Sequence, residues 1–200
     1  MSSAVHQART FFTERGGMLR TSEALSAGIH PRTLYTMRDT GELEELGRGL
    51  YRLTGLLPLS EPDLATVAKR VPRGVFCLIS ALAWHELTTE IPHEVHVALP
   101  RAARSRKLTF PPLRVFHFSP RTYEAGIEAH MIDAVPVRVY SAEKTLADCF
   151  KFRNKIGLDV ALEALRAYRR RRGSRLQEVL RYSRLCRVEK VVRPYLEAGT

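Results

Sequence analysis

The residues best suited to chemistry in this sequence are hydrogen-bond donors within the first fifty positions. An arginine can donate two parallel hydrogen bonds to one guanine, and threonine or tyrosine can reach thymine methyl groups or phosphates. The candidates of this kind are Thr21, Ser22, Arg32, Thr33, Tyr35, Thr36, Arg38 and Arg48. If the fold presents them on one face, they predict binding to double-stranded DNA.

The elements that must position these side chains can be predicted from the apolar spacing. The pattern indicates three short helices, over 3–15, 23–27 and 31–41. Thr21 or Ser22 can cap the second helix, and Gly28 can stop it because glycine tolerates the left-handed turn that follows a helix. Pro31 suits the first position of the third helix. Two short helices joined by a tight glycine turn form a helix-turn-helix.

A hairpin is expected directly after the third helix. Two apolar-flanked runs within 43–53 surround Gly47-Arg48-Gly49, which suits a glycine-supported loop. The order helix, helix-turn-helix, hairpin is typical of a winged helix-turn-helix. Arg48 would stand at the wing tip, where it could pair with phosphate or enter a minor groove. The alternative is an ordinary solvated helix face, and the agreement of turn, Pro31 and hairpin favours DNA contact.

No catalytic or metal-binding pattern is found. The sequence has no GxSxG motif, glycine-rich phosphate loop, HExxH motif or CxxC pair. His93 and His96 are three apart on an expected strand and would point to opposite faces, without further ligands at metal spacing. Glu143, Lys144 and Asp148 fit a helical salt-bridge pattern better than a nuclease centre. We therefore expect no enzyme activity and no cofactor.

The charge distribution divides the 200-residue chain. The net charge of +11 predicts an acidic partner, most commonly nucleic acid. Residues 1–55 are nearly neutral, with seven arginines and six acids, whereas 166–187 holds nine arginines and one acid. Two prolines in the segment from Gly55 to Pro62, the last of them Pro62 itself, interrupt regular structure. We expect a winged helix-turn-helix domain at 1–57 and a second domain at 62–200.

The second domain is expected to be α+β. Apolar and β-branched runs predict strands over 74–79, 94–99, 113–118 and 135–140. Ser80 can cap a helix over 81–87, and Ser141 one over 142–152. Three further apolar stripes, starting near Leu158, Leu176 and Val188, predict the final helices.

The location of the protein is expected to be cytoplasmic. No apolar run is long enough to span a bilayer, and the N-terminus lacks the pattern of a signal peptide. The three cysteines are distant in sequence, which favours reduced thiols, most simply as small core residues.

Two blocks of the sequence carry a resemblance to a known family. The N-terminal block GIHPRTLYTMR (28–38) with GELEELGRGLYRL (41–53) looks like the winged-helix domain of the AbiEi family of bacterial antitoxins. The later block SALAWHELTTEIP (80–92) with VRVYSAEKTLADCFKFRNKIGLDVALEAL (137–165) is similar to the core of the family's antitoxin domain. The later block is the more specific, because winged helices occur in many unrelated regulators.

The resemblance implies an abortive-infection (phage-defence) type IV toxin–antitoxin system with a nucleotidyltransferase-like toxin encoded alongside. It implies that the N-terminal domain binds inverted repeats in its own promoter and represses the operon. It also implies that the C-terminal domain neutralises the toxin without requiring a stable complex. The residues that fall on this antitoxin block are Lys144, Asp148, Lys151, Arg153, Asn154 and Lys155.

Two other functions remain open on the sequence alone. The chain could be a winged-helix regulator whose second domain dimerises or senses a ligand. Alternatively, the basic segment 166–187 could bind RNA or belong to a small nuclease, in which case affinity should fall steeply with salt.

Overall fold

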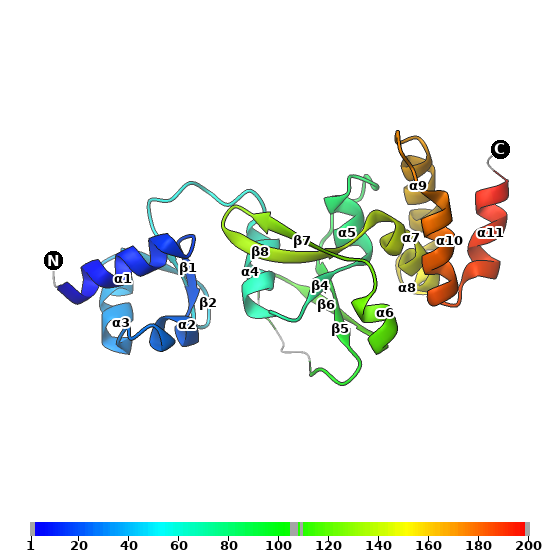
Figure 1. Ribbon diagram of the computed structural model, residues 1–200. Coiled ribbons are helices and arrows are strands. Elements are labelled where there is room, and N and C mark those ends of the chain that lie inside the picture. The colour runs from blue at the N-terminus through cyan, green and yellow to red at the C-terminus, as the bar shows by residue number, and fades with distance from the viewer. Residues whose placement is uncertain (1–2, 105–107, 109, 199–200) are drawn as a thin grey trace. The chain divides into compact units, whose positions relative to one another are not determined.

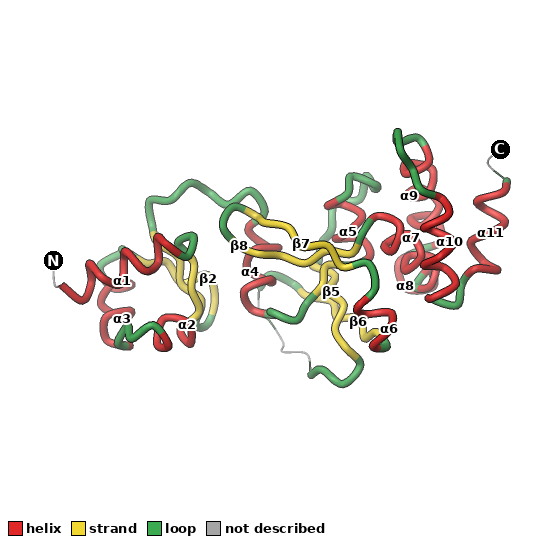
Figure 2. Tube along the Cα trace, viewed as in Figure 1, coloured by secondary structure: helices red, strands yellow, loops and turns green. Residues whose placement is uncertain are grey.

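The computed structural model describes residues 3–104, 108 and 110–198. The chain forms two compact units. The first comprises residues 1–72 with the short segments 109–111 and 130–137, and the second comprises the remainder. Figures 1 and 2 show an α+β protein in which the first unit contains both helices and strands and helices dominate the C-terminal part. The α+β class predicted from the sequence is confirmed.

The first unit follows the expected order of helices and hairpin. Its elements are α1 (Ser3–Glu14), β1 (Met18–Arg20), α2 (Thr21–Ser26), α3 (Pro31–Asp39), β2 (Leu43–Gly47), β3 (Leu50–Leu53) and α4 (Pro62–Arg70). The antiparallel sheet has the order β1-β3-β2, so the hairpin is joined by a third strand. β1 is absent from the sequence prediction because three residues are too few to show alternation.

The core of the first unit explains why α3 has a fixed orientation. Leu34 and Met37 on α3 are buried with Phe12 of α1 and Tyr51 of β3. Burying a leucine or phenylalanine side chain contributes about 1.5–3 kcal/mol to folding. Because Leu34 and Met37 occupy one face of the helix, the polar residues between them must face outward.

The second unit contains most of a five-stranded mixed sheet. Its elements, some shared with the first unit through 130–137, are β4 (Val75–Phe76), α5 (Leu78–Trp84), β5 (Val95–Pro100), β6 (Leu113–Phe118), α6 (Pro120–Glu124), β7 (Ile127–Ile132), β8 (Val135–Tyr140), α7 (Ala142–Lys151), α8 (Arg153–Ile156), α9 (Leu158–Arg169), α10 (Leu176–Leu185) and α11 (Glu189–Glu197). The strand order is β6-β5-β4-β8-β7. β4 is antiparallel to β5 and parallel to β8.

The strand predicted over 74–79 is wrong in length, and the following helix begins earlier than predicted. The backbone turns at Leu78, whose φ of 47° lies in the left-handed region, and this ends β4 after two residues. Ser80 does not cap the helix. Its hydroxyl oxygen accepts a hydrogen bond from the His96 backbone N–H at 2.9 Å, which ties α5 to β5.

The C-terminal helices pack around α7, which is buried along most of its length. α9 and α10 both contact α7, and α11 packs on α10 (Figure 1). Ser141 caps α7 as predicted, because its hydroxyl oxygen accepts from the Lys144 backbone N–H at 3.3 Å. The three cysteines are buried free thiols, which agrees with their predicted role as core residues.

Candidate functional site

The turn between α2 and α3 is built by local signals. Gly28 has a φ of 82°, a conformation that glycine adopts at little cost. His30 is the N-cap of α3, and its Nδ1 accepts a hydrogen bond from the Arg32 backbone N–H at 3.1 Å. This histidine cap was missed at the sequence level, because serine, threonine, asparagine and aspartate are the usual N-cap residues. Pro31 occupies the first helical turn as predicted.

The outward face of α3 carries the predicted donors. Arg32, Tyr35, Thr36 and Arg38 are exposed, and Thr33 is half-buried. The Arg38 guanidinium lies over the Tyr35 ring, 5.3 Å from its centroid, and donates to the Asp39 carboxylate at 2.8 Å. The helix therefore presents four exposed side chains that carry hydrogen-bond donors.

Arg48 stands at the tip of the β2–β3 hairpin and is exposed. The Glu45 carboxylate accepts a hydrogen bond from the Gly49 backbone N–H at 3.0 Å, which closes the loop. Gly49 has a φ of 71°, and a Cβ there would lie 3.1 Å from the Thr21 hydroxyl. Both the left-handed turn and the close approach of Thr21 favour glycine at this position.

The predicted capping role of Thr21 or Ser22 is wrong. α2 begins at Thr21 and its N-cap is Arg20, whose backbone N–H donates to the Glu23 carboxylate at 2.7 Å. The Thr21 hydroxyl and backbone N–H both donate to the Gly49 carbonyl, at 3.3 and 2.9 Å. Thr21 therefore fastens the hairpin tip to the start of α2, while Ser22 is exposed beside it.

Ion pairs compensate the charge of some arginines in the first unit and leave other arginines uncompensated. Four arginines of the first unit are matched by carboxylates, in the pairs Arg9–Glu42, Arg20–Glu23, Arg38–Asp39 and Arg52–Glu44. Within the described part of the chain, Arg32 and Arg48 enter no ion pair. A nearly neutral domain thus keeps two uncompensated cations on α3 and the hairpin tip, where phosphate or base contacts were predicted.

Two residues predicted for the antitoxin block lie in the interior. Lys144 and Asp148, on α7, both have 0% exposed side chains, and their Nζ and Oδ2 atoms are 2.5 Å apart. Their burial rules out a solvated helix face for this pair. Neither side chain can touch a partner in this fold, although the predicted helical i,i+4 ion pair is present.

The buried pair has further partners in the interior. The Lys144 ammonium lies 4.3 Å from the centroid of the Tyr140 ring and 4.9 Å from that of Phe118. The second oxygen of Asp148 accepts from the Cys186 thiol at 3.3 Å. Burial raises the pKa of the Asp148 carboxyl, and the Lys144 ammonium opposes that rise. Burial also raises the pKa of the Cys186 thiol to about 12, so the thiol stays protonated and remains a donor.

The other four antitoxin-block residues remain near the surface. Lys151, Asn154 and Lys155 are exposed, around the end of α7 and along α8. Arg153 is half-buried and donates to the Phe150 carbonyl at 2.9 Å. These four residues lie close together in sequence and offer three exposed polar side chains to a partner.

The arginine-rich segment 166–187 is partly used to hold the second unit together. Arg175 binds the Glu143 carboxylate at 2.8 Å, and Arg171 donates to the His85 backbone carbonyl. Arg181 and Arg184 form ion pairs with the nearby Glu178 and Glu189. These four arginines therefore have partners within the second unit, and RNA binding by the segment stays a prediction.

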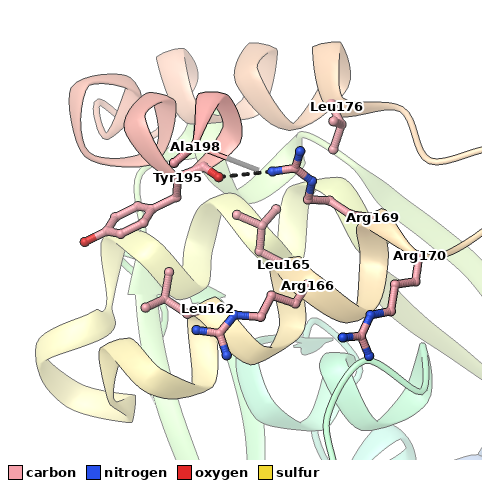
Figure 3. A pocket seen from close by; sticks show the side chains of 8 residues that line it. All are labelled: Leu162, Leu165, Arg166, Arg169, Arg170, Leu176, Tyr195 and Ala198. Carbon is pink, nitrogen blue, oxygen red and sulfur yellow. Dashed lines mark hydrogen bonds between the residues drawn. The ribbon is translucent and has the colours of Figure 1, made fainter. Parts of the chain in front are cut away.

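A cavity of about 730 Å³ lies on this part of the second unit, and Figure 3 shows the side chains that line it. It is lined by Leu162, Leu165, Arg166, Arg169, Arg170, Leu176, Tyr195 and Ala198. Arg169 extends to α11 and donates to the backbone carbonyls of Tyr195 and Leu196, both at 3.2 Å. These bonds fix the α9–α11 wall of the cavity.

A pH prediction follows from Glu143, which is buried beside Tyr168 and Arg175. Burial alone would raise the pKa of its carboxyl, but hydrogen bonds from the Tyr168 hydroxyl at 2.6 Å and the Arg175 guanidinium at 2.9 Å lower it overall. A lowered folded-state pKa contributes stability above the unfolded pKa of about 4.3, and this is lost as the pH falls through the folded value.

Glu143→Gln should therefore lower the urea midpoint at pH 7, and the deficit relative to wild type should shrink below about pH 4. Glu124→Gln, at an exposed position on α6, is the matched control and should change little. A Glu143→Gln deficit that stays constant from pH 7 to pH 3 would contradict the assignment.

No group of three or more histidine, cysteine, aspartate or glutamate side chains in the part of the chain that the structure describes could hold a metal ion. Within the same residues, no helix is both long enough and apolar enough to cross a membrane.

Comparison with known proteins gives one family. Residues 6–54 match the family model described as "Transcriptional regulator, AbiEi antitoxin". The match runs from α1 to the end of the hairpin and so contains every residue of the predicted DNA-binding set. No similar protein was found among the curated sequences.

Proposed function

We propose, from the match of its N-terminal segment to the AbiEi antitoxin family of transcriptional regulators, that this protein is an autorepressor and antitoxin. In this proposal the first unit is a winged helix-turn-helix that binds inverted repeats in its own promoter. The second unit neutralises a nucleotidyltransferase-like toxin encoded alongside. The protein itself carries out no catalysis, needs no cofactor and acts in the cytoplasm.

The observation that carries the DNA part is the surface formed by α3 and the hairpin tip. α3 presents Arg32, Tyr35, Thr36 and Arg38 outward, and Thr21 fastens the hairpin that carries Arg48 to the start of α2. A helix in the major groove with a cation reaching an adjacent phosphate or minor groove is a common docking geometry for this arrangement. Two half-sites read by a dimer would offset the nearly neutral charge of one domain.

The toxin-directed part rests on the resemblance of 80–92 and 137–165 to the family's antitoxin domain. The exposed members of that block, Lys151, Asn154 and Lys155, are the side chains that could meet a partner. Lys144 and Asp148 would act by maintaining the fold of α7.

The test is growth of cells that express the neighbouring toxin together with the full-length protein. Full-length chains are preferable to a cut near residue 60, because the first unit also contains 61–72 and 130–137. Wild type should restore growth, and a variant with Arg32→Ala and Arg48→Ala should also restore it while failing to repress a reporter driven by the operon's promoter. Lys151→Ala with Lys155→Ala should repress the reporter but restore growth poorly.

Failure of the wild-type protein to restore growth against an active toxin would leave a DNA-binding regulator without antitoxin function. Equal loss of both readouts in the Lys151→Ala, Lys155→Ala variant would show a folding defect. A lower amount of this variant than of the wild-type protein in the soluble fraction would identify that defect.

A further inference from the structure

A second cavity in the second unit, of about 440 Å³, has a strongly basic lining. The residues that line it, here called the cationic pocket, are Arg101, Ser119, Arg121, Thr122, Lys151, Arg184, Leu185, Cys186 and Arg187. They come from the end of β5, the start of α6, the end of α7 and the end of α10. Residues from four distant parts of the sequence therefore converge on one cavity.

Five cations line the cationic pocket, and no carboxylate is among the described residues that line it. Arg184 is held by Glu189 at 3.1 Å. The other four cations form no ion pair with any residue in the described part of the chain. They are Arg101, Arg121, Lys151 and Arg187. Like charges gathered in one concave site repel one another, and a bound anion relieves this repulsion.

Arg187 stands where glycine is the usual residue. It follows α10 with a φ of 60°, and the next N–H, that of Val188, donates to the Ser183 carbonyl at 2.8 Å. This is the pattern of a helix C-terminus that normally ends in a left-handed glycine. An arginine here has a conformational cost that glycine would avoid, and it adds a cation to the pocket lining.

Two hydroxyl groups also line the cationic pocket. The Ser119 and Thr122 hydroxyl oxygens are 2.9 Å apart and hydrogen-bonded to each other. Cys186 lines the pocket, and its thiol donates to the buried Asp148 carboxylate. The Asp148 charge is already matched by Lys144 at 2.5 Å, so it does not cancel the positive field of the pocket.

We infer that the cationic pocket binds the polyphosphate group of a small molecule such as a nucleoside triphosphate. Four of the five cations have no ion-pair partner among the described residues, which suits a ligand with several negative charges, and the planar guanidinium donates two parallel hydrogen bonds to phosphate oxygens. A volume of about 440 Å³ falls in the range of small-molecule sites and is too small for a length of duplex. This ligand site goes beyond the proposed function and does not depend on it.

The experiment is isothermal titration calorimetry of the full-length protein with inorganic tripolyphosphate at low salt, followed by competition with ATP. Wild type should bind one equivalent saturably, and ATP should compete. Arg187→Gly should weaken binding about tenfold, the loss of one charge-assisted contact. Because glycine is favoured at this φ, the variant should not lose thermal stability, so weaker binding cannot be attributed to unfolding.

The matched control is Arg172→Gly, which removes the same charge from an exposed position outside the cationic pocket. It should bind tripolyphosphate like wild type. Absence of saturable binding in the wild type at millimolar ligand would overturn the inference, as would equal weakening by both variants. If a single-stranded oligonucleotide binds this protein and tripolyphosphate does not displace it, the basic residues bind nucleic acid and not a small polyphosphate.

Discussion

Asp148→Ala is expected to lower the free energy of unfolding by about 3–5 kcal/mol, because it leaves the Lys144 ammonium buried without its partner. Both side chains are fully buried, and the 2.5 Å contact between them is their shared ion pair. Lys144→Ala should cost a similar amount for the reciprocal reason. Urea unfolding followed by circular dichroism, with the slope compared between variants, measures both.

The paired replacement Lys144→Met with Asp148→Leu separates a packing role from an ionic one. Replacing a whole buried ion pair by apolar residues of similar volume is often neutral or stabilising, so this variant should unfold near the wild-type midpoint. Lys151→Ala, exposed on the same helix, should change stability by no more than about 0.5 kcal/mol. Single variants that lose less than about 1 kcal/mol would refute the energetic role assigned to the pair.

The same variants bear on the antitoxin proposal. If Lys144 and Asp148 act only through the fold, the Met and Leu double variant should still protect cells from the toxin. If protection is lost while the midpoint is unchanged, the charges themselves take part in antitoxin function.

Arg32→Ala should weaken binding to the promoter repeats by about tenfold or more if the guanidinium reads a base. Arg32 has no ion-pair partner within the described residues, so its removal subtracts directly from the DNA-facing charge. Binding to unrelated duplexes should fall much less. Fluorescence anisotropy with the repeat and with a scrambled duplex, at several salt concentrations, provides both affinities.

Arg48→Ala tests the hairpin tip by a different signature. A phosphate contact at Arg48 predicts similar weakening for all sequences and a salt slope smaller by about one. Arg9→Ala is the matched control, because it removes the same charge from α1, where Glu42 already compensates it at 2.8 Å. Unchanged promoter binding in both the Arg32 and Arg48 variants would exclude α3 and the hairpin as the interface.

The helices and the hairpin within residues 3–53 were largely predictable because their boundaries are set by residues close in sequence. Gly28 and Pro31 separate α2 from α3, and Gly47 and Gly49 flank the hairpin tip. The spacing of Leu34 and Met37 determines which side chains of α3 face outward. Each of these signals acts within a few residues, so no tertiary contact is needed to recognise it. The N-cap of α2 was misassigned because Thr21 binds Gly49, 28 residues away.

In the second unit, the sequence by itself determined the α+β class, the apolar faces of the C-terminal helices and the Ser141 cap. Only the tertiary structure decided that Lys144 and Asp148 are buried, because a Lys–Asp pair at i,i+4 has the same pattern on a solvated helix. Their burial depends on α10, which packs against α7 and brings Cys186 to Asp148 across 38 residues. The cationic pocket likewise exists only once β5, α6, α7 and α10 meet, because its charges are isolated arginines and a lysine until the chain folds.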